Sequence, residues 1–126
     1  MLTVHFETEV ETLKKVCADL GENYEAGGTF FVLREDGEPV GFMRTQMGDY
    51  VRITHFKVKN GEINRENREF FLHAMMFKFS LSPIPLEVEG HIPELEKFGF
   101  RYEDGFMRID DSRDINLHGD CKGAQK

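Results

Sequence analysis

The sequence contains no tryptophan and, among its 126 residues, only two cysteines and four prolines. Cys17 and Cys121 are too few and too far apart for a disulfide framework, and no Cys-x-x-Cys metal motif occurs. The histidines show no ligand spacing either, so we expect free thiols in a reducing cytoplasm and no metal. No stretch approaches the roughly 18 apolar residues of a membrane-spanning helix, and the N-terminus lacks a secretion signal pattern. We therefore expect neither a membrane protein nor a secreted one.

An excess of positive charge is also absent. The chain has 16 Lys and Arg residues against 23 Asp and Glu residues, which gives a formal net charge of −7. Nonspecific binding to nucleic acid needs a basic footprint, so we expect no nucleic-acid partner. The negative charge favours solubility and is compatible with a cationic amine substrate. The 12 phenylalanines suit either a hydrophobic core or a homodimer interface.

Hydrophobic patterning in the first half predicts a helix followed by a three-stranded antiparallel meander. Apolar residues recur at three- and four-residue steps from Phe6 to Leu20, which predicts a helix over residues 5–20. Three β-rich runs joined by tight turns then predict strands at residues 29–34, 39–46 and 50–59.

The second half alternates helices with short strands. Asn64 is a suitable N-cap for a helix over residues 65–79. The remaining predicted elements are a strand at residues 84–88, a short helix from Pro93 to Phe98 and a hairpin formed by residues 100–103 and 106–110. We expect one domain over residues 1–110 and a loosely held polar tail over residues 111–126.

Two local strings resemble the GNAT superfamily of N-acetyltransferases. Residues 34–42 read Arg-Glu-Asp-Gly-Glu-Pro-Val-Gly-Phe, similar to the hairpin between the family's second and third strands. Residues 95–100 read Leu-Glu-Lys-Phe-Gly-Phe, similar to the string before its final strands. The resemblance covers residues 28–110. It implies an α+β fold with a mixed, mostly antiparallel sheet flanked by helices, and an enzyme that transfers an acetyl group from acetyl-CoA to a small-molecule or peptide amine.

The sequence departs from the family at the cofactor loop. The family places a Q/R-x-x-G-x-G/A loop before its long helix, where the glycines let the backbone approach the pyrophosphate. With Arg65 matched to the leading Arg, Arg68 and Phe70 occupy the positions of small residues. The candidate cofactor ligands are then Arg65, Asn67 and Arg68, with the strand-end backbone at Val58. We expect Phe70 to obstruct the loop if it points toward the ligand.

Charge at the same helix start has two interpretations. Glu66 and Glu69 would stabilise the helix by offsetting its dipole, but they would repel a phosphate. Arg65 and Arg68 either hold phosphate oxygens through charge-assisted hydrogen bonds or pair with the neighbouring glutamates on a solvated face.

The catalytic residues are also altered. Many members of the family place a tyrosine before the second string to protonate the departing thiolate, and Leu95 stands there instead. The candidate acid is then Tyr102 and the candidate base is His55. Glu87 and Glu89 alternate with apolar residues and are expected on an exposed strand face.

Two functions stay open on the sequence alone. One is a divergent acetyltransferase with a rebuilt cofactor loop. The other is a non-catalytic binding or assembly module with the same fold, since a fold does not by itself establish chemistry.

Overall fold

Seven strands and two long helices make up the described part of the chain, residues 1–117, in a computed structural model. The strands are β1 (Leu2–Glu7), β2 (Thr29–Glu35), β3 (Glu38–Gln46), β4 (Val51–Val58), β5 (Leu86–Glu89), β6 (Arg101–Glu103) and β7 (Phe106–Ile109). The helices are α1 (Val10–Asp19) and α2 (Arg65–Phe79), with the 3-10 helices η1 (Pro93–Phe98) and η2 (Ser112–Asp114). Among these helices, none is long and apolar enough to cross a membrane.

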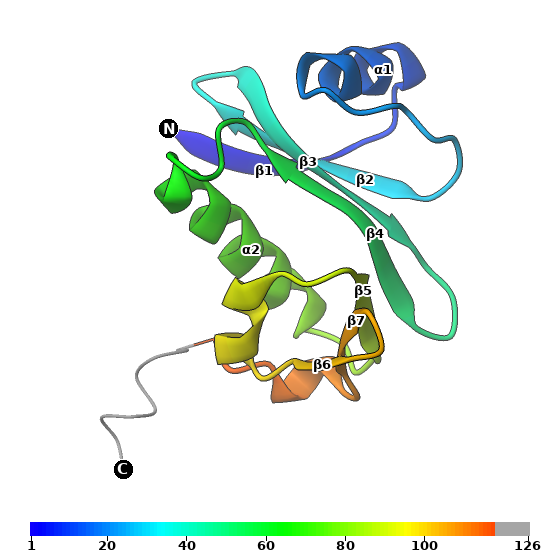
Figure 1. Ribbon diagram of the computed structural model, residues 1–126. Coiled ribbons are helices and arrows are strands. Elements are labelled where there is room, and N and C mark those ends of the chain that lie inside the picture. The colour runs from blue at the N-terminus through cyan, green and yellow to red at the C-terminus, as the bar shows by residue number, and fades with distance from the viewer. Residues whose placement is uncertain (118–126) are drawn as a thin grey trace.

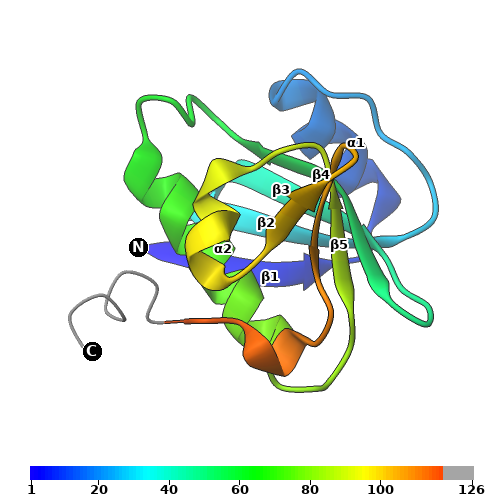
Figure 2. The same ribbon diagram turned by 60° about the horizontal axis from the view of Figure 1, so that its bottom comes forward.

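The strands form one sheet in the order β1-β2-β3-β4-β5-β7-β6. Every neighbouring pair is antiparallel except β4 and β5, which are parallel. The prediction of an α+β fold with a mixed, mostly antiparallel sheet is therefore confirmed. The two long helices lie on opposite faces of the sheet (Figures 1 and 2).

Alternation along β2 divides the hydrophobic core between the two faces. Phe30 and Val32 pack with α1, whereas Phe31 and Leu33 belong to the larger cluster beneath α2. Successive side chains of a strand point to opposite faces, so a strand covered on both sides is apolar throughout. The sheet is therefore held from both sides, and its two faces are fixed before any functional side chain is placed.

α1 begins later than the sequence pattern predicts. Residues 2–7 form β1, which pairs antiparallel with β2, and the helix starts at Val10. Leu2 and Val4 pack at a period of two against the larger cluster, whereas Phe6 is 59% exposed. The predicted helix over residues 5–20 was wrong at its start because pairing with β2 outweighs the helical spacing that begins at Phe6.

The other predicted elements are confirmed within a few residues. α2 covers residues 65–79 as predicted, and its residues Phe71, Leu72, Met75, Met76 and Phe79 are buried. Cys17 lies on the buried face of α1. Asn64 stands at the N-cap position, although its side chain makes no capping hydrogen bond.

The chain stays packed beyond residue 110. Ser112 is fully buried and its hydroxyl accepts a hydrogen bond from the Ile84 N–H at 3.1 Å. Ile115 is also buried in the larger cluster. Residues 111–115 thus pack onto the domain, past the boundary expected at residue 110. The rest of the predicted tail from residue 118, with Cys121, lies outside the described residues.

Two neighbouring phenylalanines test how α2 sits on the sheet. Phe71 is fully buried and its ring centroid lies 5.5 Å from that of Phe56, whereas Phe70 is 40% exposed. We predict that Phe71→Ala lowers the free energy of unfolding by about 3–5 kcal/mol because it opens a cavity in the core. The matched Phe70→Ala variant should cost less than about 1 kcal/mol. Urea unfolding measures both, and equal losses would contradict this orientation of α2.

Candidate active-site cleft between β4 and β5

The two parallel strands of the sheet run together for only part of their length. β4 and β5 pair through Val51–Leu86, Arg52–Glu87 and Ile53–Val88. β4 then continues to Val58 toward α2, while the chain leaving β5 turns toward η1 (Figure 1). Beyond Ile53, the described chain pairs no strand with this edge of β4.

A β-bulge lies at the point where the strands separate. The register between β3 and β4 shifts so that Arg44 faces His55 and Thr45 faces Ile53, which leaves Thr54 as the extra residue. A bulge bends its strand and increases the local twist. Thr54 therefore marks the place where β4 turns away from β5.

Arg44 fixes this bulge from the neighbouring strand. Its buried guanidinium donates to the Thr54 hydroxyl at 2.9 Å and to the Ala26 carbonyl at 3.1 Å. Two residues after Ala26, the backbone of Gly28 lies close to β3. Gly28 has a φ of +80°, and an added Cβ would lie 2.7 Å from the Thr45 carbonyl oxygen. Arg44 thus joins the α1–β2 loop to the bulge, and Gly28 lets the loop approach closely enough.

The free edge of β4 presents backbone groups to the gap. The Lys59 N–H donates to the Val40 carbonyl at 2.7 Å, on the side of β3. Since successive amides of a strand point to opposite edges, the N–H groups of Phe56 and Val58 point toward the gap. The edge therefore offers two hydrogen-bond donors to a ligand that lies along it. The Val58 side chain itself is buried in the core.

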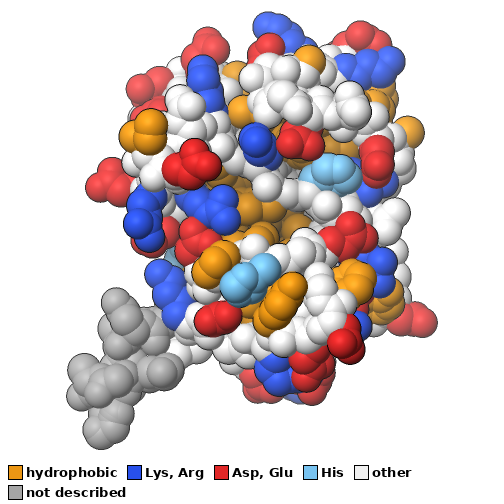
Figure 3. Space-filling model, viewed as in Figure 1, with side chains coloured by type: hydrophobic (Ala, Val, Ile, Leu, Met, Phe, Trp, Pro, Cys, Tyr) orange, Lys and Arg blue, Asp and Glu red, His pale blue; other side chains and the backbone are white. Residues whose placement is uncertain are grey.

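An open cleft of about 330 Å³ occupies the gap between the diverging strands. Figure 3 shows this hollow with hydrophobic atoms in its floor and a histidine on each side. The residues from β4 and from the chain after β5 are Ile53, Thr54, His55, Phe56, Lys57, Val88, Glu89, Gly90, His91 and Ile92, and Glu22 and Phe42 complete the lining.

Two further hollows continue from this cleft toward the start of α2. The middle one, of about 440 Å³, shares Phe56 and Lys57 with the cleft. The outer one, of about 700 Å³, shares Gly61, Glu62 and Arg68 with the middle one. Together they form a groove from the histidines to the first turn of α2.

The predicted base, His55, lines the cleft from β4. Its ring stacks on Phe42 with centroids 6.2 Å apart, and its Nδ1 lies 2.9 Å from the Thr54 hydroxyl. The bulge therefore sets both the position and the hydrogen bonding of this imidazole.

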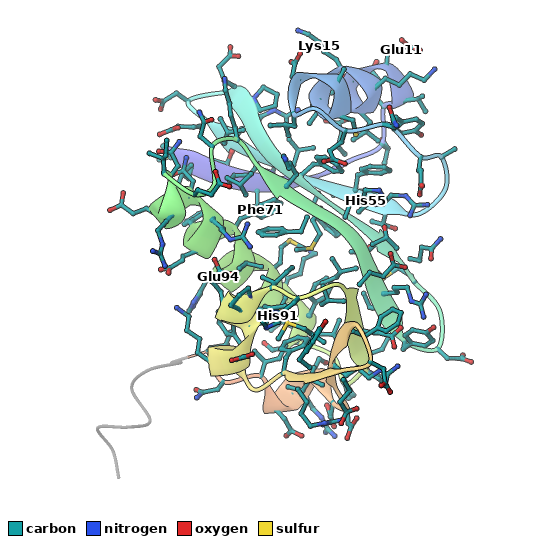
Figure 4. The ribbon with its side chains drawn as sticks, in the orientation of Figure 1. Glu11, Lys15, His55, Phe71, His91 and Glu94 are labelled. Atoms are coloured by element: carbon teal, nitrogen blue, oxygen red, sulfur yellow. The ribbon has the colours of Figure 1, made fainter. Side chains whose placement is uncertain are left out.

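A second histidine, His91, faces the cleft from the opposite side (Figure 4). Its Nε2 lies 3.1 Å from Glu96 Oε2, and its ring centroid lies 4.5 Å from that of Tyr102. Tyr102, the predicted acid, is 49% exposed and is not among the residues that line the cleft. It contacts the site through His91. The sequence analysis did not select His91 as a candidate, and its place directly after a strand end and a glycine was the signal that could have found it.

The predicted cofactor ligands separate in space. Arg65 and Arg68 both line the outer hollow. The Asn67 side chain points elsewhere, since its Nδ2 lies 3.4 Å from Glu35 Oε1. Phe70 is 40% exposed and lines none of the three hollows, so the predicted obstruction does not occur. Leu95 is fully buried in the core, so its position provides no acid to the cleft.

Arg68 reaches across to η1 instead of pairing along its own helix. Its Nε and Nη2 donate to the two carboxylate oxygens of Glu94 at 2.5 Å and 3.3 Å. Its guanidinium carbon also lies 5.0 Å from the Phe56 ring centroid. Burial acts to raise the pKa of Glu94, but the hydrogen bonds from Arg68 and the charges of Arg68 and Arg65 lower it overall. Arg68 therefore pairs with a glutamate, but with Glu94 of η1 and not with the neighbouring glutamates of its own helix.

Glu87 also departs from its predicted place on an exposed strand face. It is 8% exposed and bridges two strands, with Arg52 Nε 2.9 Å from Oε1 and Arg108 Nε 2.8 Å from Oε2. Burial acts to raise the pKa of Glu87, but hydrogen bonds from Arg108 and Arg52 and their charges lower it overall. This bridge ties β4 to β7 through β5, just below the point where the cleft opens.

No family model and no curated protein matches the sequence, but solved structures do match the fold. The ribosomal-protein-S18-alanine N-acetyltransferase of Escherichia coli is 15% identical, with a TM-score of 0.67 over 87% of this chain and 94% of that chain. A GNAT family acetyltransferase of Elizabethkingia anophelis, with acetyl-CoA bound, is 15% identical with a TM-score of 0.59 over 86% of this chain and 97% of that chain. The chain has the GNAT fold. A GNAT family acetyltransferase of Brucella melitensis in complex with acetyl-CoA gives a TM-score of 0.60 at 12% identity, over 86% of this chain and 88% of that chain.

The two strings that resemble the GNAT family occupy turns of this GNAT fold. Residues 34–42 form the β2–β3 hairpin, where Asp36 and Gly37 have φ values of 51° and 88°. Residues 95–100 end η1, where Gly99 has a φ of 106°. Positive φ values favour glycine and tolerate aspartate. Both strings can therefore be recognised in the sequence, because the backbone geometry of these turns restricts which residues can occupy them.

Ionisation of Glu87 gives the fold a pH dependence. Its pKa in the folded protein is depressed below its ordinary value of 4.5. The ionised carboxylate therefore stabilises the fold above that value, and this contribution is lost as the pH falls through the folded-state pKa. We predict that Glu87→Gln is less stable than the wild type at pH 7 and that the difference shrinks between about pH 5 and pH 3.

Urea unfolding at several pH values measures this difference. The matched control is Glu11→Gln, which removes an exposed carboxylate of α1 (Figure 4). A Glu87→Gln deficit that stays constant down to pH 3, or an equal response in the control, would contradict the assigned role of the bridge.

Proposed function

We propose that this protein is an acetyltransferase that transfers an acetyl group from acetyl-CoA to an amine. The observation that carries the proposal is the open cleft between β4 and β5, with donors from a free strand edge on one wall and a histidine on each side. Structures with acetyl-CoA bound are among those with the same fold, which supports this choice of ligand.

The groove suits each part of an acyl-CoA ligand. The N–H groups of Phe56 and Val58 would hold the amide-rich pantetheine arm, as an added strand pairs with a sheet edge. Arg65 and Arg68 line the outer hollow, where they would bind phosphate oxygens in place of a glycine-rich loop. Acetyl-CoA supplies an activated thioester when bound. Because the Asn67 side chain lies near Glu35, Asn67 could contact the phosphates only through its backbone N–H in the first turn of α2.

Proton transfer from the amine falls to the histidines. An ammonium group must lose a proton before its nitrogen can attack a carbonyl carbon, and imidazole accepts protons near neutral pH. His55 on β4 and His91 after β5 line the same cleft from opposite sides. His91 is oriented by Glu96 and its ring contacts that of Tyr102. Tyr102 stays the candidate proton donor, because Leu95 cannot act. The acceptor is a small-molecule or peptide amine.

A specific observation favours a second function, a non-catalytic assembly module. Phe70 and Phe77 lie seven residues apart on α2 and are 40% and 53% exposed. Residues at this spacing share one face of a helix. Such a face suits a second protein surface, including that of another copy of the chain, and Leu95 leaves the cleft without the tyrosine that many GNAT enzymes use.

Calorimetric titration with acetyl-CoA tests the proposal directly. We predict binding to the wild type and roughly 10- to 150-fold weaker binding to Arg65→Ala, because a charge-assisted hydrogen bond to phosphate contributes about 1.5–3 kcal/mol. The matched control is Lys15→Ala, which removes a cation from α1 on the other face of the sheet (Figure 4). No binding at millimolar acetyl-CoA would leave the assembly module as the function.

Turnover with a panel of amines then separates the two histidines. We predict that the variant lacking the base, His91→Ala or His55→Ala, loses about 10²–10⁴-fold in kcat. Its acetyl-CoA affinity should stay close to that of the wild type, which separates catalysis from folding. If both variants retain full kcat, neither imidazole acts as the base.

A further inference from the structure

Arg68 occupies the narrow point of the groove. It lines both the middle and the outer hollow, so its guanidinium can be reached from either side. It rests on the Phe56 ring, and Phe56 in turn lines the cleft between the histidines. No other arginine among residues 1–117 lines two of these three hollows.

Glu94 occupies one edge of this guanidinium, through Nε and Nη2. The pair is mostly shielded, with side-chain exposures of 25% for Arg68 and 18% for Glu94. The two contacts link α2 to the first turn of η1, which are the two sides of the outer hollow. A carboxylate and a phosphate present similar pairs of oxygens to an arginine, so the Glu94 carboxylate competes with a phosphate for the Nε and Nη2 edge of Arg68.

The charges around the outer hollow cancel. Its lining holds three cations and three carboxylates, namely Arg65, Arg68, Lys97, Glu62, Glu69 and Glu94. Two of the cations are paired, Arg68 with Glu94 and Lys97 with Glu69 at 3.8 Å. Arg65 makes no ion pair within residues 1–117 and adds its charge to the field at Glu94. A ligand with several negative charges therefore gains little net attraction while Glu94 stays in place.

We propose that Glu94 competes with the phosphates of the ligand for Arg68, so that a pyrophosphate-bearing ligand binds by displacing the Glu94 carboxylate. The ion pair then acts as a latch across the groove, and Glu94 sets how tightly the groove holds its ligand. This inference rests on the proposed function, because it takes the coenzyme A pyrophosphate as the displacing group. It predicts that removing a carboxylate beside the site strengthens binding, whereas a purely structural pair predicts no gain.

Calorimetric titration with coenzyme A tests the latch without any acceptor. We expect Glu94→Gln to lower the Kd by about tenfold, because Arg68 can then bind the phosphate without first breaking its ion pair with Glu94. The gain should vanish when Arg68→Ala is combined with Glu94→Gln, because the two residues act through one contact. Glu94→Asp keeps the charge but cannot maintain both contacts, and we expect about a threefold gain. Circular dichroism establishes that each variant is folded.

The matched control is Glu69→Gln. It removes an equal charge from the same hollow but leaves Arg68 and Glu94 paired. A gain for Glu94→Gln that exceeds the gain for Glu69→Gln supports the latch. Equal gains for both variants, or no gain for Glu94→Gln and Glu94→Asp, would overturn it while the proposed function stands. If no variant binds coenzyme A, the proposed function fails and the latch fails with it.

Discussion

The separation of β4 from β5 is the constraint on which the rest of the site depends. Parallel strands in register leave no room for a ligand between them, because their backbone groups satisfy one another. The bulge at Thr54 ends this pairing after three residue pairs, and Arg44 holds the bulge by hydrogen bonds to Thr54 and to the loop after α1. The cleft, its free strand edge and the facing histidines all follow from this divergence.

Two arginine–glutamate contacts near the cleft differ in their surroundings. The Arg52–Glu87–Arg108 bridge crosses strands that remain paired, so it supports the sheet where the strands are closed. The Arg68–Glu94 pair crosses a groove that stays hollow on both sides. In the first, the Glu87 carboxylate is buried between two arginines of neighbouring strands, whereas in the second Arg68 borders two hollows. The same chemistry therefore supports a structural role in one place and an exchangeable role in the other.

Much of the fold was predictable from the sequence because its signals are local. The Asp-Gly turn at residues 36–37 and Gly99 restrict their own backbone angles, and the buried stripe of α2 repeats at helical spacing. β1 was not predictable from the same signals, because its apolar residues also fit the start of a helix and only pairing with β2 decides between them. Local patterns thus predicted most helices and strands, but they did not decide between helix and strand where one segment fits both.

The site was less predictable because it depends on contacts between distant residues. Arg65 and Arg68 followed from the cofactor loop, but the partner of Arg68 lies 26 residues away on η1. The bulge at Thr54 and the place of His91 opposite His55 depend on strand register, which no local string specifies. Burial of Glu87 likewise needs arginines from two other strands, so alternation alone assigned it wrongly to an exposed face.

The most direct test of ligand binding along the free edge of β4 is an amide NMR titration with acetyl-CoA. Hydrogen bonds from the Phe56 and Val58 N–H groups to a ligand should give the largest shift changes there, with further changes at Arg68 and at the start of α2. Unchanged amides at Phe56 and Val58, with shifts confined to the exposed face of α2 or to β6 and β7, would contradict a cofactor cleft between β4 and β5.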